Sequence, residues 1–296
     1  MTNTYLNSIN ARIESFPALP EIVTKVIAIT ANPESSANNL MQVILPDQSM
    51  CATILKVANS AFFGIPREVA TIERAVVVLG YEEIKNIVIG KAIFSSFPKT
   101  TKDTRYAIGL FWEHTFTCGL AAKIIGEDLL LSPSELFIAG LIHDIGKLAM
   151  FLAFPEQYPL LRELANHHFI DNIAEEQQCF TMSHDQVGLQ LAKKWLLPEQ
   201  LVAAIGHHHA PQDAAAFRQY ALIVQVADIL SLMYCSPETL KGKDVSKIFA
   251  DFLPETAKLW QEIGLSWSEN NLGLWFEKLK HSRETDQVIL SIFTSA

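Results

Sequence analysis

The stretch AGLIHDIGKL places a His-Asp doublet, His143 and Asp144, in an otherwise apolar run with Lys147 just after it. Burying unpaired charged side chains is costly, so these residues need partners elsewhere in the chain. The residue types alone allow two interpretations. The doublet could be a self-satisfied polar pair inside a packed helix. It could also be half of a metal site with hydrolytic chemistry, because imidazole and carboxylate groups bind first-row transition metals.

Further histidines and one further aspartate lie in apolar, helix-like sequence and could supply these partners. They are His114 in LFWEHTFTCGL, His184 in FTMSHDQVGLQLAKKWLLP, His208 and His209 in AIGHHHAP, and Asp228 in LIVQVADILSLM. Each one alone has an ordinary explanation, as a hydrogen-bonded core residue or as a helix terminus where an imidazolium favours the helix dipole. Taken together they favour a shared cation, which would offset the cost of burying all of them.

This set predicts a site for one or two divalent metal ions, with Fe, Mn, Zn and Ni as the candidates. The carboxylate of Asp144 can bridge two metals while the histidines complete each coordination sphere. Two metals about 3.5–4 Å apart support in-line attack on phosphate esters. The predicted chemistry is therefore metal-dependent hydrolysis, if the site is catalytic.

Helical periodicity dominates the segments that must position these residues. Residues 18–30 place apolar side chains on one stripe at helical spacing, and residues 72–94 predict two helices broken near Gly80. The β-branched run AVVVL could support a strand, but no hairpin dipeptide or alternating partner strand lies nearby. We therefore predict an all-α fold. In FTMSHDQV, either Ser183 or Asp185 could cap the start of a helix.

Two shifts in composition divide the chain. Residues 95–103 are polar around Pro98, and residues 235–244 combine Pro237 and Gly242 with charges. These shifts predict helical subdomains at residues 1–100 and 101–235, followed by a helical C-terminal extension at residues 236–296. The extension is rich in large apolar side chains, which we interpret as core or packing surface rather than a partner site.

Bulk properties narrow the classes of function. The 296 residues carry a formal net charge of −9 and no Lys/Arg-rich run, which disfavours binding to nucleic acid or to an anionic membrane. No run reaches the roughly 18 uninterrupted apolar residues of a membrane helix, and the N-terminus lacks a secretory pattern. The four cysteines form no CxxC pair, which is typical of small buried thiols in a reduced compartment. We therefore expect a cytoplasmic protein.

The pattern of candidate ligands resembles the HD-domain superfamily of metal-dependent phosphohydrolases. A closer resemblance is to the HDOD family, whose hallmark is an Asn-Ser-Ala stretch, here residues 59–61, before a Leu-Gly, here residues 79–80. The later stretch SHDQVGLQLAKKWLLPEQLVAAIGHHHAP is similar to that family's His-x-x-x-Gly, Trp-x-x-Pro and His-His before Pro. The resemblance spans residues 10–235 and leaves the C-terminal tail outside it.

The HDOD resemblance implies an all-helical module of bacterial signal transduction, with an N-terminal bundle packed on an HD-like domain. Such a module acts by binding a regulatory protein partner or a small signalling ligand. Many family members have lost part of the metal constellation, whereas this sequence retains a full set of candidates. The set includes Lys147 of the HDIGK motif, which could contact a substrate phosphate or balance the charge of the site.

The alternative is a metal-dependent phosphohydrolase or phosphodiesterase that acts on a nucleotide or cyclic dinucleotide, with Asp144 and Lys147 in catalytic roles. The related HD-GYP phosphodiesterases, which cleave cyclic di-GMP, carry a Gly-Tyr-Pro element. After its His pair this chain reads APQDAAAF, and Leu110 stands where some of those enzymes supply an extra glutamate ligand. Both departures weaken the case for that particular substrate.

Overall fold

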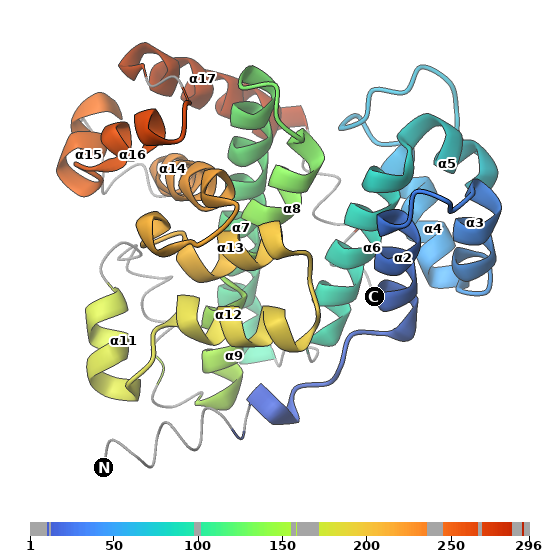
Figure 1. Cartoon of the computed structure of the whole chain (residues 1–296), viewed down its shortest axis with the longest axis horizontal. Coiled ribbons are helices and arrows are strands. Elements are labelled where there is room, and N and C mark those ends of the chain that lie inside the picture. Colours follow the sequence, from blue (N-terminus) through green and yellow to red (C-terminus); the bar gives the residue numbers. More distant parts are fainter. Residues whose placement is uncertain are drawn as a thin grey trace. The chain divides into compact units, whose positions relative to one another are not determined.

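The computed structural model describes residues 11, 13–97, 102–154, 158, 172–235, 245–265, 268–285 and 292. All regular secondary structure in these residues is helical, which confirms the predicted all-α fold. The chain forms two compact units (Figure 1). The larger unit contains residues 1–16 and 100–280, and the smaller unit contains residues 17–99 and 281–296.

The smaller unit is a bundle in which one long helix packs against three others. Its helices are α2 (Glu21–Ala31), α3 (Ala37–Ile44), α4 (Gln48–Ala58), α5 (Ile72–Leu79) and α6 (Tyr81–Ser96). Helix α6 packs on α2, α4 and α5 (Figure 1). The break predicted within residues 72–94 is confirmed, because Gly80 separates α5 from α6 with φ 84°, a conformation that glycine adopts at little cost.

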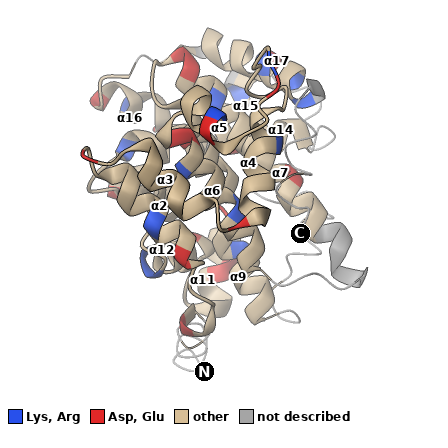
Figure 2. Ribbon diagram, turned by 90° about the vertical axis from the view of Figure 1, so that its right-hand side faces the viewer, with Lys and Arg blue, Asp and Glu red and all other residues tan. Residues whose placement is uncertain are grey.

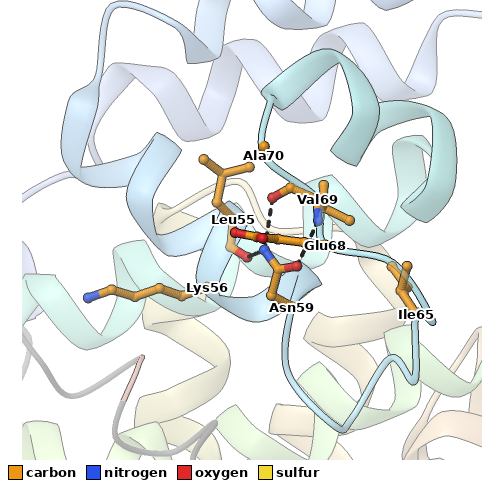
Figure 3. A pocket seen from close by; sticks show the side chains of 7 residues that line it. All are labelled: Leu55, Lys56, Asn59, Ile65, Glu68, Val69 and Ala70. Carbon is orange, nitrogen blue, oxygen red and sulfur yellow. Dashed lines mark hydrogen bonds between the residues drawn. The ribbon is translucent and has the colours of Figure 1, made fainter.

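Asn59, the first residue of the Asn-Ser-Ala stretch, closes the loop that follows α4. Its amide group donates to the carbonyl oxygens of Leu55 and Val69, each at 2.8 Å, and its side-chain oxygen accepts from the Val69 N–H at 2.8 Å. Figure 3 shows these bonds beside an open pocket. The asparagine therefore ties the end of α4 to the far end of the loop, which is a structural role in the smaller unit.

The larger unit holds most of the helices. They are α7 (Lys102–Asp128), α8 (Pro133–Ile142), α9 (Ile145–Ala153), α11 (Asn172–Phe180), α12 (His184–Lys194), α13 (Glu199–His207), the 3-10 turn η1 (Pro211–Asp213), α14 (Arg218–Cys235), α15 (Val245–Phe252), α16 (Thr256–Glu262) and α17 (Glu269–Thr285), whose last residues belong to the smaller unit. The long helix α7 packs against α8 and α14, and α13 packs against α8, α12 and α14 (Figure 1).

Two glycines let α7 and α8 touch through their backbones. A Cβ atom on Gly140 would lie 2.8 Å from the carbonyl oxygen of Cys118, and one on Gly119 would lie 2.8 Å from the carbonyl oxygen of Phe137. Any side chain at these positions would push the helices apart, because real Cβ contacts are essentially never this short. This close packing holds α7 against the end of α8, where the His-Asp doublet begins.

Some of the large apolar side chains near the C-terminus belong to the core, whereas Leu274 is 60% exposed. Trp260 and Trp275 are fully buried with ring centroids 5.9 Å apart, and Trp275 Nε1 donates to Asp128 Oδ2 at 3.2 Å. These contacts join α16 and α17 to the end of α7. The division into three segments stays a prediction. Parts of both predicted boundaries, residues 98–101 and 236–244, lie outside the described residues.

One described stretch, Pro133–Ala153, is long and apolar enough to cross a membrane by length and composition. Of its most apolar window, 89% is buried inside the fold, and the chain turns at His143 and Asp144 between α8 and α9. We assign this stretch to the core of the larger unit, because buried core helices pass the same test.

The distribution of surface charge bears on the expectation that the chain binds no nucleic acid. Lys and Arg are interspersed with Asp and Glu over the described elements in the view of Figure 2. The expectation that the chain binds no nucleic acid stays a prediction.

All four cysteines are free, and Cys118 is buried while Cys179 is exposed. The expectation of buried thiols is therefore confirmed for Cys118 and wrong for Cys179.

Candidate metal centre

The structure brings all seven predicted metal ligands together inside the larger unit. They form two groups, within each of which the ligand atoms lie within 4.8 Å of one another: Asp144, His184, His208 and His209 in one, and His114, His143 and Asp228 in the other. His207, the last residue of α13, is partly exposed and belongs to neither group. His167 and His168 lie outside the described residues.

A break between two helices aims the His-Asp doublet into the cluster. His143 is the C-cap of α8 and Asp144 is the N-cap of α9. Neighbouring residues within one helix point about 100° apart, as the 3.6-residue turn requires. At this junction, however, His143 Nε2 lies only 3.4 Å from Asp144 Oδ2. The turn therefore lets two adjacent side chains serve one site.

A glycine brings α9 and α12 into backbone contact beside the cluster. A Cβ atom on Gly146 would lie 1.8 Å from the carbonyl oxygen of His184 and 2.8 Å from the backbone nitrogen of Gly188. Both neighbours are backbone atoms, which cannot move aside as a flexible side chain would. The close approach places His184, the first residue of α12, against Asp144 at the start of α9.

The two carboxylate oxygens of Asp144 face different histidines. Oδ1 lies 3.2 Å from His184 Nε2 and 3.6 Å from His208 Nε2. Oδ2 lies 3.4 Å from His143 Nε2 and 3.7 Å from His114 Nε2. Asp144 therefore stands between the two groups, as the sequence-based prediction of a bridging carboxylate requires.

Asp228 and His209 complete the two groups of candidate ligands, one residue in each group. Asp228 Oδ1, from α14, lies 3.1 Å from His114 Nε2 and 3.6 Å from His143 Nε2. His209 Nε2 lies 3.0 Å from His184 Nε2. Asp228 has 12% of its side chain exposed, whereas His114 and His143 are almost completely buried. The second carboxylate thus lies at a more open edge of the cluster.

Several atoms that face the centre of the cluster are buried without a hydrogen bond from the described part of the chain. They are His143 Nε2, His208 Nε2, Asp144 Oδ1 and Asp228 Oδ1. Buried polar atoms nearly always have a hydrogen-bond partner, so such a concentration needs a ligand. Imidazole nitrogen and carboxylate oxygen are a donor set that suits divalent first-row metals. The residues present therefore fit a metal ion.

Hydrogen bonds at the far side of three rings orient them for this role. Their Nδ1 atoms contact backbone or hydroxyl oxygens: Gly140 O for His143 at 2.7 Å, Ile205 O for His208 at 2.9 Å, and Ser231 Oγ for His114 at 2.7 Å. An Nδ1–H that donates to an oxygen leaves Nε2 as the basic nitrogen that points to the centre. Each ring is held in the tautomer that a metal ligand needs.

Lys147 is held by the bridging carboxylate. Its Nζ donates to Asp144 Oδ2 at 2.6 Å, and the lysine is only 3% exposed. Burial opposes the charged forms of both groups and is the largest single effect on each. For Asp144, the imidazoles of His143, His184 and His114 together with the Lys147 ammonium outweigh burial. For Lys147, the carboxylates of Asp144, Asp228 and Glu176 together outweigh it. The pKa of Asp144 is held well below its usual range and the pKa of Lys147 is raised. Of the two roles expected for Lys147, this contact corresponds to balancing the charge of the site.

Glu176 is a member of the site that the sequence did not predict. It lies on α11, is 4% exposed, and accepts hydrogen bonds at Oε2 from His184 N at 2.6 Å and from His184 Nδ1 at 2.8 Å. Burial and the Lys147 ammonium lower the pKa of His184, but the carboxylates of Glu176 and Asp144 together outweigh them and raise the pKa to about 9. In the sequence, the one available signal was that Glu176 shares an i, i+3, i+7 stripe with Ile173 and Phe180.

Comparisons with known proteins agree with this architecture. The family model described as the HDOD domain matches residues 16–211. An uncharacterized protein of Treponema pallidum (strain Nichols) is 27% identical over 219 residues, which is 70% of this chain and 40% of that protein. This chain therefore spans less than half the length of that relative.

Two solved structures share the fold over almost the whole chain. A Shewanella amazonensis SB2B protein, provisionally described as a phosphohydrolase, has a TM-score of 0.72 at 22% identity, covering 97% of this chain and 98% of that one. An HDOD domain protein of unknown function from Geobacter sulfurreducens has a TM-score of 0.71 at 22% identity, covering 100% of this chain and 99% of that one. These likenesses establish the fold.

Proposed function

This chain belongs to the HDOD family, and we propose that it is a regulatory module of bacterial signal transduction that carries a divalent metal in its larger unit. In this proposal the module acts by binding a protein partner or a small signalling ligand. The observation that supports the metal is the convergence of four buried, unbonded ligand atoms, two imidazole nitrogens and two carboxylate oxygens, in the described core. A divalent cation would bond these atoms, to which the described part of the chain gives no hydrogen bond.

The ligands would be divided between two positions that share one carboxylate. Asp144, His184, His208 and His209 would hold an ion at one position, and His114, His143 and Asp228 would hold an ion at the other. A divalent metal bound there supplies Lewis-acid chemistry and lowers the pKa of bound water towards about 7. The chain itself orients the rings through their Nδ1 bonds and balances the bridging carboxylate with Lys147.

Metal analysis of protein purified without a His tag tests this proposal. We expect at least one divalent ion per chain in the wild type and a stoichiometry near zero in Asp144→Ala, because both groups depend on that carboxylate. Asp213→Ala is the matched control, since Asp213 is an exposed aspartate of η1 in the same unit and should leave the metal content unchanged. A wild-type stoichiometry near zero would remove the metal site from the proposal.

The shared carboxylate also favours a second candidate function, metal-dependent hydrolysis of a nucleotide or cyclic dinucleotide. Two ligand groups joined by one bridging aspartate suit a pair of metals, the arrangement used for in-line attack on phosphate esters. In that case Asp144 and Lys147 would take catalytic roles. A panel of nucleotides and phosphodiesters with added Mn²⁺ or Fe²⁺ distinguishes the two functions. If the wild type hydrolyses a substrate and Asp144→Ala abolishes this activity, the result supports hydrolysis. If metal-loaded protein hydrolyses none of the substrates, the result supports the binding module.

A further inference from the structure

We propose that Glu176 is a positioning residue that holds His184 in its ligand orientation within the group of Asp144, His184, His208 and His209. This inference rests on the proposed metal site. Glu176 lies on α11 and touches neither Asp144 nor Asp228 in any described hydrogen bond or ion pair, and its contact with the candidate ligands is with His184.

The two carboxylate oxygens of Glu176 accept hydrogen bonds from different residues. Oε2 accepts both the backbone N–H of His184 at 2.6 Å and its ring Nδ1 at 2.8 Å. Oε1 accepts the hydroxyl of Tyr158 at 2.6 Å, which holds the carboxylate itself in place. One carboxylate therefore holds both the backbone position and the ring rotation of His184. The ring is left with Nε2 directed at Asp144 Oδ1, 3.2 Å away.

His184 differs from the other oriented histidines in the charge of its partner. The Nδ1 atoms of His114, His143 and His208 face a hydroxyl or backbone carbonyl oxygens, which are neutral. His184 Nδ1 faces a buried carboxylate. A carboxylate behind an imidazole raises its basicity as a ligand and fixes its tautomer, and loss of such a partner typically weakens metal affinity about 10–100-fold.

Titration of metal-free protein with Co²⁺, followed by visible absorption and calorimetry, tests the role of Glu176. We expect Glu176→Ala to weaken Co²⁺ binding at the His184 position about 10–100-fold and to change the visible spectrum of the bound Co²⁺, because His184 leaves the ligand set. Glu176→Gln should retain more affinity, since an amide oxygen can accept both bonds from His184 while its NH₂ donates to Tyr158. Glu175→Ala, an exposed neighbour on α11, is the matched control and should bind like the wild type.

The outcomes separate this role from the proposed function. A wild type that takes up no Co²⁺ overturns the metal site and the role of Glu176 with it. A wild type that binds Co²⁺ together with a folded Glu176→Ala of equal affinity and spectrum overturns only the role of Glu176. Should Glu176→Ala fail to fold, Glu176→Gln decides: a weaker Co²⁺ affinity than wild type supports the role, and an unchanged affinity overturns it.

Discussion

The ammonium of Lys147 lies 2.6 Å from Asp144 Oδ2, one helical turn along the chain, and both residues are almost completely buried. This contact couples the charge of the HDIGK lysine to the carboxylate that lies between the two groups of candidate metal ligands. Removing one member of such a pair leaves an uncompensated charge in the core, which is strongly destabilising.

Lys147→Met should therefore lower the free energy of unfolding of metal-free protein by about 3–5 kcal/mol. Urea denaturation measures this change. The double variant Lys147→Met/Asp144→Asn should lose much less than the sum of its two single variants, and additive losses would contradict a direct coupling. Lys123→Met is the control, because Lys123 pairs with the half-exposed Glu127 and such surface pairs contribute at most about 1 kcal/mol.

Gly146→Ala should disrupt the contact between α9 and α12. The added methyl group would meet the carbonyl oxygen of His184 at 1.8 Å, so the helices must separate. Overpacking of this kind typically costs about 1–3 kcal/mol, and here it also moves His184 away from Asp144. We expect lower thermal stability and weaker metal uptake in the same variant. Gly109→Ala, on an open face of α7, should be neutral or slightly stabilising, and equal losses in both variants would argue against the close contact.

Lys194→Met should release the N-terminal segment from α12. Lys194 Nζ donates to the carbonyl oxygens of Ile13, Glu14 and Phe16 at 2.8, 2.6 and 3.0 Å. Methionine keeps the apolar stem and removes all three bonds, so we expect faster hydrogen exchange at residues 13–16 and a loss of about 1.5–3 kcal/mol. The neighbouring exposed Lys193 provides the control Lys193→Met. Unchanged exchange at these residues would show that other contacts hold the segment.

Asn59→Ala should destabilise the smaller unit without touching the metal centre. The substitution removes the three hydrogen bonds that join Asn59 to Leu55 and Val69, and it leaves the Val69 N–H without that acceptor. We expect a loss of about 1–3 kcal/mol and faster hydrogen exchange at Val69. Asn38→Ala, at an exposed position of α3, serves as the control. Metal content should equal that of the wild type, and a loss of metal would contradict a purely structural role for Asn59.

The helical class and the seven candidate metal ligands could be predicted from the sequence, because both predictions depend on local sequence pattern. Helical spacing of apolar residues determines which face of a segment is buried, and Gly80 marks a helix break through its own backbone preference. Each charged or imidazole side chain within apolar sequence has an ordinary explanation alone, but the whole set favours a shared ligand. For that reason the seven predicted ligands could be listed before their contacts were known, and the structure brings them together. Of the two residues that could begin this helix, Ser183 and not Asp185 occupies the N-cap position of α12.

Only the tertiary structure decided which atoms face one another. Periodicity identifies a buried face but does not show which residues pack against it. The sequence therefore did not distinguish Glu176 from the other acidic residues of its polar segment, and the structure shows that its carboxylate contacts His184. The partner of Lys147 and the division of the Asp144 oxygens between two groups depend on the turn at residues 143–144 and on the approach of α9 to α12. These relationships join residues from separate helices, and their geometry follows from packing that no single segment encodes.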